Sequence, residues 1–414
     1  MECRAESLLP EQFGPLQGVR ILSTGTIIAQ PFAAALAAEM GAEVIQIERP
    51  GLGDVIRGLG VPIGHVDGSP IGSLWAQERR NTFHTTLNFA APEGRNLFLR
   101  LIAAADIWME SSKAGTYAQW GLDDATVLAA NPSIVITHVS GYGQTGHPDY
   151  LNRASYDPIG QAFGGTMGIT GSPDPEPPMT AAPLAADYTT AQVCLWSSLA
   201  AYIHAQRTGQ GQVIDLAQYE AVHKVMSGSM MEYFELGIER GRRGNQSGNS
   251  QPFGTYQAKD GWVVIAAIGA VFDRVCTVLD LDLNDGYWRE GRTNLESIAG
   301  IEFDAILRGW LEERTVQEVV EILNAAQVGC SAVMTLKDIA EDPHYRAREV
   351  HTEWEDLQLG RTVKGIGIVP KFSETPGKIW RGSTPLGYDN DAVYRHFLGM
   401  EDAELERLRE RGVI

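Results

Sequence analysis

The chain has 414 residues, of which 44% are hydrophobic and 21% charged, so it can bury a large core divided between two domains. Its formal net charge of −19 argues against nucleic acid or an anionic membrane as a partner, because both demand a basic face. No apolar run approaches the ~20 residues of a membrane span, and the N-terminus lacks a signal peptide's order of basic and then apolar residues. The four cysteines are far apart and form no disulfide framework, so we expect a cytoplasmic protein.

The first part of the chain predicts a βαβ unit, with a strand at 18–22, an alanine-rich helix from Pro31 to Met40 and a second strand at 42–48. The turn after the first strand lacks the Gly-x-Gly-x-x-Gly fingerprint, which makes an NAD site a weak reading. A helix at 92–105 and strands at 106–109 and 133–139 continue the alternation. The pattern predicts an α/β fold with a mostly parallel, Rossmann-like sheet.

A run of small residues from Met179 leads to Asp187 at the head of a helix that we expect to end near Gly209. Apolar residues recur in it at helical spacing and predict an amphipathic helix: Val193, Trp196, Leu199, Ala200 and Ile203. Asp187 has two interpretations. It can cap the helix, or it can act as a nucleophile, since alanines leave room for a bulky ligand and a helix N-terminus supports negative charge.

The rest of the chain predicts a strand at 213–216 and a long helix from Tyr219 to about Gly237, followed by a polar glycine-rich segment at 240–250. We place the domain change there. Residues 1–224 and 341–414 are expected to form the large domain, and 225–340 a smaller α+β domain. The tail is rich in loops and ends in a charged helix at 402–411, so we expect it to pack on the first domain or on a partner subunit.

Sequence motifs exclude several chemistries. The nine histidines have no metal-ligand spacing, so we predict no metal. The Gly-x-Ser-x-Gly motif of serine hydrolases and the Walker loop are both missing. What remains is a set of cations in predicted loops of the first domain, which would suit a phosphorylated ligand or would simply be solvated: Arg49, Arg57, Arg79, Arg80 and Lys113.

Stretches from the N-terminus to near the C-terminus resemble the class III CoA-transferases, which include carnitine, bile-acid, 2-hydroxyacyl and formyl-CoA transferases. The matching stretches are residues 13–20, 41–49, 110–113, 138–146, 153–162, 185–187, 208–212, 371–372 and 376–382. The carnitine and bile-acid branch is the most similar. The resemblance implies that two subunits interlock as a homodimer and that acyl-CoA and a free carboxylic acid are the substrates.

The resemblance also implies roles for single residues. Asp187 matches the catalytic aspartate, Arg49 a nucleotide-contacting arginine and Lys113 a CoA-contacting lysine, while Arg80 is assigned to phosphate. The chain departs from the family pattern at Gln119 and Trp120, where relatives carry a CoA-contacting arginine. It also matches the glycine loop that shields the intermediate in formyl-CoA transferase only in part, at Gly248 and the Gln251-Pro252 pair.

The chemistry agrees with this resemblance, because a carboxylate that is ionised at neutral pH can attack a thioester without a general base. The implied intermediates are an acyl-aspartyl anhydride and an aspartyl-CoA thioester. An α-methylacyl-CoA racemase of the same fold would need a Gly-His-Asp histidine, where this chain has Tyr156-Asp157. A non-catalytic CoA-binding protein would not need Asp187. Carnitine-like, 2-hydroxy and bile-acid-type acids all remain open as acceptors.

Overall fold

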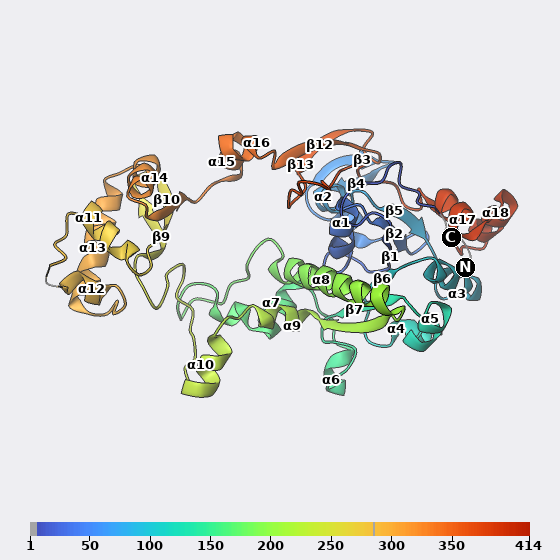
Figure 1. Cartoon of the computed structure of the whole chain (residues 1–414), viewed down its shortest axis with the longest axis horizontal. Coiled ribbons are helices and arrows are strands. Elements are labelled where there is room, and N and C mark those ends of the chain that lie inside the picture. The colour runs from blue at the N-terminus through green and yellow to red at the C-terminus, as the bar shows by residue number, and fades with distance from the viewer. Residues whose placement is uncertain (1–5, 285) are drawn as a thin grey trace. The chain divides into compact units, whose positions relative to one another are not determined.

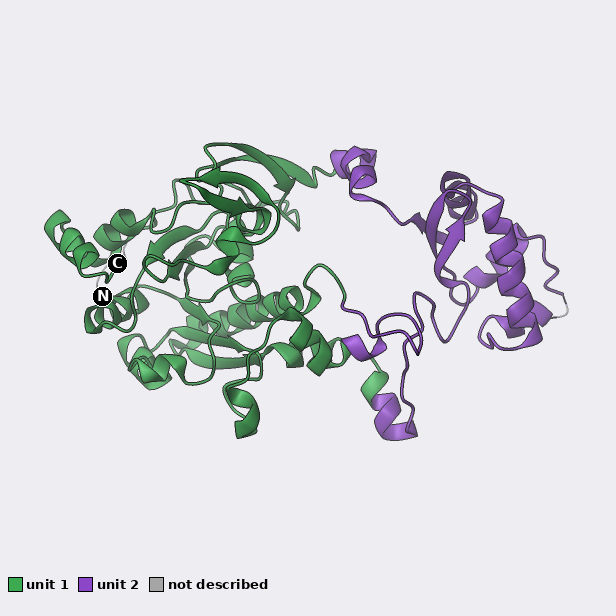
Figure 2. Cartoon of the chain, turned by 180° about the vertical axis from the view of Figure 1, so that it is seen from behind, with its two compact units in different colours: residues 1–166, 181–230, 348–414 green, residues 167–180, 231–347 purple. Residues whose placement is uncertain are grey.

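The computed structural model describes residues 6–284 and 286–414, and it divides into two compact units (Figure 1, Figure 2). Unit 1 comprises the described residues up to 166 together with 181–230 and 348–414, and unit 2 comprises 167–180 and 231–347. The sequence division, 1–224 with 341–414 against 225–340, assigned 167–180 to the large domain. This segment instead contacts residues of unit 2: the backbone N–H of Gly244 donates to the carbonyl of Gly171 at 2.8 Å, and Arg242 pairs with Asp174.

Unit 1 is built on a six-stranded, entirely parallel sheet in the order β5-β2-β1-β6-β7-β8. The strands are β1 (Arg20–Ser23), β2 (Glu43–Glu48), β5 (Phe83–Thr86), β6 (Ile107–Glu110), β7 (Val135–Ser140) and β8 (Gln212–Ala217). The strand order runs outward in both directions from the neighbouring strands β1 and β6, which is the doubly wound arrangement. The predicted α/β fold with a parallel sheet is therefore confirmed.

Both faces of this sheet are buried, because successive residues of each strand point to opposite sides. Ile21 and Met109 pack with α1 (Pro31–Glu39) and α8 (Ala185–Thr208). Leu22 and Trp108 pack with α3 (Pro92–Ala103) and α5 (Asp124–Ala130) on the other face. The four central strands, β2, β1, β6 and β7, therefore each contribute to two cores, one on each face.

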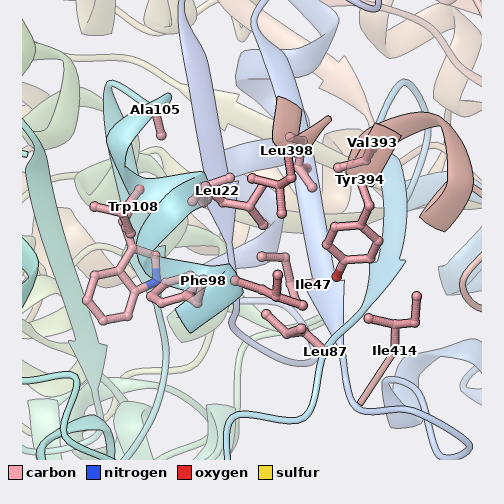
Figure 3. Close-up of a cluster of buried hydrophobic side chains, with 14 of the residues drawn as sticks. Leu22, Ile47, Leu87, Phe98, Ala105, Trp108, Val393, Tyr394, Leu398 and Ile414 are labelled. Carbon is pink, nitrogen blue, oxygen red and sulfur yellow. The ribbon is translucent and has the colours of Figure 1, made fainter. Parts of the chain in front are cut away.

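The C-terminal tail completes the second of these cores. Figure 3 shows Tyr394, Leu398 and Ile414 beside Leu22 and Ile47 of the sheet. They come from α17 (Asn390–Leu398) and from the end that follows α18 (Asp402–Glu410). The Tyr394 hydroxyl donates to the carbonyl of Thr86 at 2.7 Å. The tail thus packs on the unit formed by the first part of the chain.

Helix α8 runs to Thr208 and ends on Gly209, whose φ of 72° provides the left-handed cap, close to the predicted end. Its buried face differs from the predicted apolar stripe, because Trp196 and Ile203 are 61% and 49% exposed. Small side chains are buried instead: Thr190, Ala191, Cys194, Ser198, Ala201 and Ala205. They allow a close approach to the alanines of α1 and to β7, where the hydroxyls of Ser198 and Thr137 lie 2.7 Å apart.

The predicted long helix from Tyr219 to Gly237 is wrong as a single element. It is divided into α9 (Gln218–Lys224) and α10 (Ser229–Leu236). Ser227 has a φ of 55° between them, a left-handed conformation that ends the helical hydrogen-bonding pattern. Two hairpins were not predicted: β3 (Pro62–Val66) with β4 (Ser69–Gly72), and β12 (His351–Asp356) with β13 (Arg361–Ile366).

Unit 2 contains a three-stranded antiparallel sheet in the order β11-β10-β9, which agrees with the predicted α+β class. Its strands are β9 (Phe253–Ala258), β10 (Gly261–Ala266) and β11 (Gly329–Ala332), and the core around Phe272 and Phe303 is closed by α11 (Val271–Val278), α13 (Ile298–Glu312) and α14 (Val316–Ala325).

The other described elements are η1 (Val55–Gly58), α2 (Ser73–Glu78), α4 (Thr116–Gln119), α6 (Pro148–Leu151), α7 (Asp157–Gly164), η2 (Thr166–Ile169), α12 (Tyr287–Gly291), α15 (Leu336–Glu341) and α16 (Pro343–Ala347). None of the described helices is long and apolar enough to span a bilayer.

Candidate active site

Two cavities lie beside the loops that follow β1 and β6, the pair of strands at which the sheet order reverses. One has a volume of about 240 Å³ and the other of about 400 Å³, and Thr26 and Ser112 line both. Thr26 follows β1 and Ser112 follows β6. Ligands of doubly wound sheets bind at the carboxyl ends of the strands at this reversal. The two neighbouring cavities therefore form the candidate site.

Asp187 lines the smaller cavity from the first turn of α8, and its side chain is largely buried. It does not cap that helix. Oδ1 of Asp157 accepts the backbone N–H of Ala186 at 2.8 Å and that of Asp187 at 3.2 Å, while the N-cap residue, Leu184, makes no side-chain cap. The capping interpretation of Asp187 is thus wrong, because another carboxylate already occupies the helix terminus.

A network of amides holds the two carboxylates. Gln161 donates to Oδ2 of Asp157 at 2.7 Å, and its amide is tied at both ends to the backbone of Ala181, at 2.8 and 3.0 Å. Gln218 donates from Nε2 to Oδ1 of Asp187 at 2.5 Å. All four side chains of these aspartates and glutamines are buried.

Burial and, to a smaller extent, the neighbouring Asp157 carboxylate raise the pKa of Asp187, the hydrogen bond from Gln218 offsets part of the rise, and the resulting pKa is about 7. The expectation that this carboxylate is already fully ionised at neutral pH is therefore corrected. Near pH 7 the protonated and ionised forms of Asp187 are both well populated, and only the ionised form is nucleophilic.

Lys113 is brought to the same cavity as Asp187. It lies in the loop after β6, where its carbonyl accepts the backbone N–H of Thr116 at 3.1 Å and the Thr116 hydroxyl at 2.7 Å. Its side chain is exposed and forms no ion pair with any of the residues that the structure describes. A positive charge is thus available beside the candidate nucleophile.

Arg49 lines the larger cavity, at the end of β2. Its side chain is exposed, and its carbonyl accepts the backbone N–H of Gly53 at 3.0 Å, which closes a turn. Phe89 and Trp120 line the same cavity and stack with ring centroids 5.7 Å apart. This wall of the larger cavity is therefore aromatic at Trp120, where the family resemblance led us to expect an arginine nearby.

The structure does not bring Arg80 to either cavity. Its guanidinium is buried, pairs with Glu39, donates to the carbonyl of Ile366 at 2.6 Å and lies 4.5 Å from the ring centre of Trp354. These contacts give Arg80 a structural role and leave its predicted contact with phosphate without support. Arg57 and Arg79 are likewise engaged, with Glu48 at 2.6 Å and with Asp54 at 3.6 Å.

Sequence reasoning missed the residues that surround Asp187. The Asp157-Pro158 pair begins α7, and a proline in the first turn of a helix is a helix-start signal that could have identified Asp157 as a structural residue. Gln218 and Gln161 carry no comparable signal, because their role depends on packing between helices. No group of three or more His, Cys, Asp or Glu suited to a metal occurs within 6–284 and 286–414.

A second buried cluster lies by the loop after β6. His138 in β7 contacts Glu110 at 2.6 Å through Nδ1 and Asp124 at 2.8 Å through Nε2. Burial alone would lower the pKa of His138, but the hydrogen bonds and charges of Asp124 and Glu110 outweigh it and raise the pKa to about 9. His138 is thus held between two acidic side chains next to the loop that presents Lys113.

Comparison with known proteins identifies the family. Residues 16–390 match the model of CoA-transferase family III. The bile acid CoA-transferase BaiK of Clostridium scindens is 38% identical over 97% of this chain and 90% of its own length. The L-carnitine CoA-transferase of Proteus mirabilis is 34% identical over 99% of this chain and 98% of its own.

Solved structures show the same fold. A CAIB/BAIF family protein from Brucella suis has a TM-score of 0.79 at 29% identity, covering 93% of this chain and all of its own. Rv3272 from Mycobacterium tuberculosis has a TM-score of 0.77 at 22% identity, covering 92% of this chain and 99% of its own. Because the family model matches most of the chain and two relatives are 38% and 34% identical over nearly all of it, this protein belongs to CoA-transferase family III.

Proposed function

We propose that this CoA-transferase moves CoA from an acyl-CoA thioester to a free carboxylic acid, with Asp187 as the attacking group. The observation that carries the proposal is the position of Asp187. Its carboxylate does not cap α8, and it lines a cavity beside β1 and β6, the strands at which the sheet order reverses. The first turn of a helix stabilises negative charge that develops beside it. No other described carboxylate lines that cavity.

The reaction proceeds by exchange at three carbonyl carbons, those of the donor, of Asp187 and of the acceptor. An oxygen of Asp187 attacks the thioester carbonyl carbon, the carbon–sulfur bond breaks, and the CoA thiolate leaves with the electron pair, so that an acyl-aspartyl anhydride forms. The thiolate then attacks the aspartyl carbonyl carbon and releases the donor as a carboxylate. The resulting aspartyl-CoA thioester is attacked by the acceptor carboxylate, which gives a second anhydride. Return of the thiolate to the acceptor acyl carbon frees Asp187.

Binding of CoA is assigned to two of the cations that line the cavities. Arg49 in the larger cavity and Lys113 in the smaller one suit phosphate groups, because Arg and Lys make charge-assisted hydrogen bonds to phosphate oxygens. Arg80 is left out of this assignment because its guanidinium is already paired. The names of the relatives favour a bile-acid-type or carnitine-like acceptor, and a 2-hydroxy acid is the third class to include in a screen.

The proposal also includes a cytoplasmic homodimer. Cys194, Cys276 and Cys330 are free thiols, as is usual in a reducing compartment. Trp196 and Ile203 leave an apolar stripe on the exposed side of α8, which a partner subunit would cover. Sedimentation at nanomolar concentration should give a dimer, and a folded and active monomer would contradict this part of the proposal.

The experiment that tests the chemistry is trapping of the enzyme with an acyl-CoA in the absence of acceptor. The protein should gain CoA covalently, and hydroxylamine should cleave the adduct and mark the peptide that contains Asp187. Asp187→Asn should form no adduct and show no transfer, while Asp149→Asn, which changes an exposed carboxylate on α6, serves as the control. An active Asp187→Asn enzyme, with no adduct in the unmodified protein, would remove Asp187 from the mechanism.

A further inference from the structure

Gln218 is the first residue of α9 and directly follows β8, and its side chain is buried. Its amide is held on three sides. Nε2 donates to Oδ1 of Asp187 at 2.5 Å, and Oε1 accepts the Ser155 hydroxyl at 3.0 Å. Gly160 of α7 lies against it so closely that a Cβ there would come within 2.7 Å of Cδ of Gln218.

These contacts fix which end of the amide faces Asp187. An ionised carboxylate can only accept hydrogen bonds, whereas the Ser155 hydroxyl can donate one. The amide nitrogen of Gln218 therefore points to Asp187 and the amide oxygen to Ser155 whenever Asp187 is ionised. The packing against Gly160 leaves the side chain little room to turn.

The two oxygens of Asp187 consequently have different surroundings. Oδ1 accepts the Gln218 amide, while Oδ2 has no hydrogen bond to any residue within the described ranges. We propose that Gln218 is a positioning residue that reserves Oδ2 for attack and keeps Oδ1 as the carbonyl oxygen of the acyl-aspartyl and aspartyl-CoA intermediates. This inference rests on the proposed function, because it assumes that Asp187 is the nucleophile.

The assignment has a consequence for each oxygen atom. When Oδ2 forms the anhydride and the thiolate attacks Cγ, the Cγ–Oδ2 bond breaks and the donor acid leaves with that oxygen. When the acceptor carboxylate attacks Cγ, the thiolate leaves and one acceptor oxygen becomes the new Oδ2. Negative charge develops on Oδ1 in both attacks on Cγ, and the Gln218 amide stabilises it. Oδ1 is therefore retained through every turnover, and Oδ2 is replaced in each.

The test is an isotope count on Asp187. The enzyme is run for many turnovers with an ordinary acyl-CoA and an excess of acceptor acid whose carboxylate oxygens are both the heavy isotope. The Asp187 peptide is then weighed by mass spectrometry. We expect one heavy oxygen in the unmodified enzyme. Two heavy oxygens would overturn the inference, because they require the carboxylate to rotate between cycles so that Oδ1 and Oδ2 exchange places. No heavy oxygen would instead overturn the proposed function.

Variants of Gln218 test whether this residue determines the number of heavy oxygens on Asp187. Gln218→Leu should incorporate two heavy oxygens and lower kcat by about a hundredfold, as expected for a lost donor to a developing oxyanion, with little change in the KM for acyl-CoA. Gln218→Glu keeps the side-chain volume but places a carboxylate against Asp187. It should move the acidic limb of the pH profile to higher pH, since two adjacent carboxylates cannot both ionise readily.

The matched control is Gln317→Leu, which removes an amide from the exposed face of α14, where it donates a hydrogen bond to Glu321 at 2.9 Å. It should behave as the unmodified enzyme in rate, pH profile and isotope count. A single heavy oxygen and an unchanged rate in Gln218→Leu would overturn the role of Gln218. If that variant does not fold, Gln218→Glu and the count in the unmodified enzyme still decide the question.

Discussion

Oδ1 of Asp157 accepts the backbone N–H of Asp187 at 3.2 Å, so the carboxylate that caps α8 lies directly beside the carboxylate proposed to attack the thioester. The two groups have opposite demands. The cap is favoured by a negative charge at the helix N-terminus, whereas that same charge makes it harder for Asp187 to ionise. The helix is thus stabilised at the expense of the ionised form of Asp187.

Replacing Asp157 by Asn should separate these two effects. Asn still caps a helix but carries no charge, so stability should be nearly kept while the pKa of Asp187 falls. The acidic limb of the pH–rate profile should move to lower pH. Asp157→Ala should make the same shift but also cost about 0.5–2 kcal/mol in the free energy of unfolding. An unchanged pH profile in both variants would show that Asp157 does not influence the ionisation of Asp187.

The pH dependence of the unmodified enzyme follows from the pKa of Asp187. Because only the ionised carboxylate attacks, kcat/KM for the acyl-CoA should rise with pH and level off above about 7. Initial rates at low acyl-CoA concentration, measured between pH 5 and pH 9 as an approximate window around that value, check this. A flat profile across the window would contradict a raised pKa for the attacking group.

Stability should change with pH in the opposite direction to activity. The folded pKa of Asp187, about 7, lies above its unfolded value of 3.8, so the folded state binds this proton more tightly. The contribution of the protonated group is present at low pH and is lost as pH rises through about 7. Asp187→Asn carries no such titration, so its stability relative to the unmodified protein should increase between pH 5 and pH 8, by more than the ~1.4 kcal/mol of a single pKa unit. Denaturant unfolding at both pH values measures the difference.

Lys113 and Arg49 should contribute to affinity for the CoA ester. Lys113→Ala and Arg49→Ala should each weaken acyl-CoA binding by roughly tenfold to a hundredfold, the value of a charge-assisted hydrogen bond of ~1.5–3 kcal/mol. Affinity for the free acid should be nearly unchanged. Lys337→Ala, which removes an exposed lysine from α15 in unit 2, is the control. Unchanged acyl-CoA affinity in both variants would place the phosphates elsewhere.

The fold of unit 1 could be predicted from the sequence because its signals are local. Proline at the start of α1 and α3, apolar strands buried on both faces, and Gly209 at the end of α8 each determine an element from its own residues. The Asp67-Gly68 turn of the β3–β4 hairpin was equally local, with both residues at positive φ, but it was overlooked. The break at Ser227 also had a local signal, the Ser227-Gly228 dipeptide that is typical of turns, and this signal was overlooked as well.

The site could be predicted only in part, for a different reason. The position of Asp187 at a helix head is a local property, but Gln218 and Asp157 reach it through the packing of α7 and α9 against α8, which one sequence does not reveal. For Arg80 the error is the opposite one, because the sequence suggested a ligand contact that the structure does not support. In sequence it resembles Arg49 and Lys113, and only the structure places Glu39 against its guanidinium. Buried charge pairs of this kind cannot be told from ligand-binding cations by composition.

The last prediction concerns Gly160, which determines how closely α7 approaches Gln218. Its own φ is not in the left-handed region, and in a helix interior alanine is ordinarily more stable than glycine by about 0.5–1 kcal/mol. A Cβ at this position, however, would lie 2.7 Å from both Cδ and Oε1 of Gln218. The glutamine must then move, and because it is buried between Ser155 and Asp187 it can do so only by lengthening its hydrogen bonds.

Gly160→Ala should therefore lower kcat by ~10- to 100-fold through loss of a hydrogen bond to a charged group. The acidic limb of its pH profile should move to higher pH, because the Gln218 contact lowers the pKa of Asp187. Gly309→Ala is the matched control, since it lies within α13 and its Cβ would meet no atom within 4 Å. That change should keep full activity and add stability. If Gly160→Ala also kept full activity with an unchanged pH profile, the Gln218 amide would have retained its contact with Asp187 despite the added methyl group. The close packing of α7 on Gln218 would then be irrelevant to the reaction.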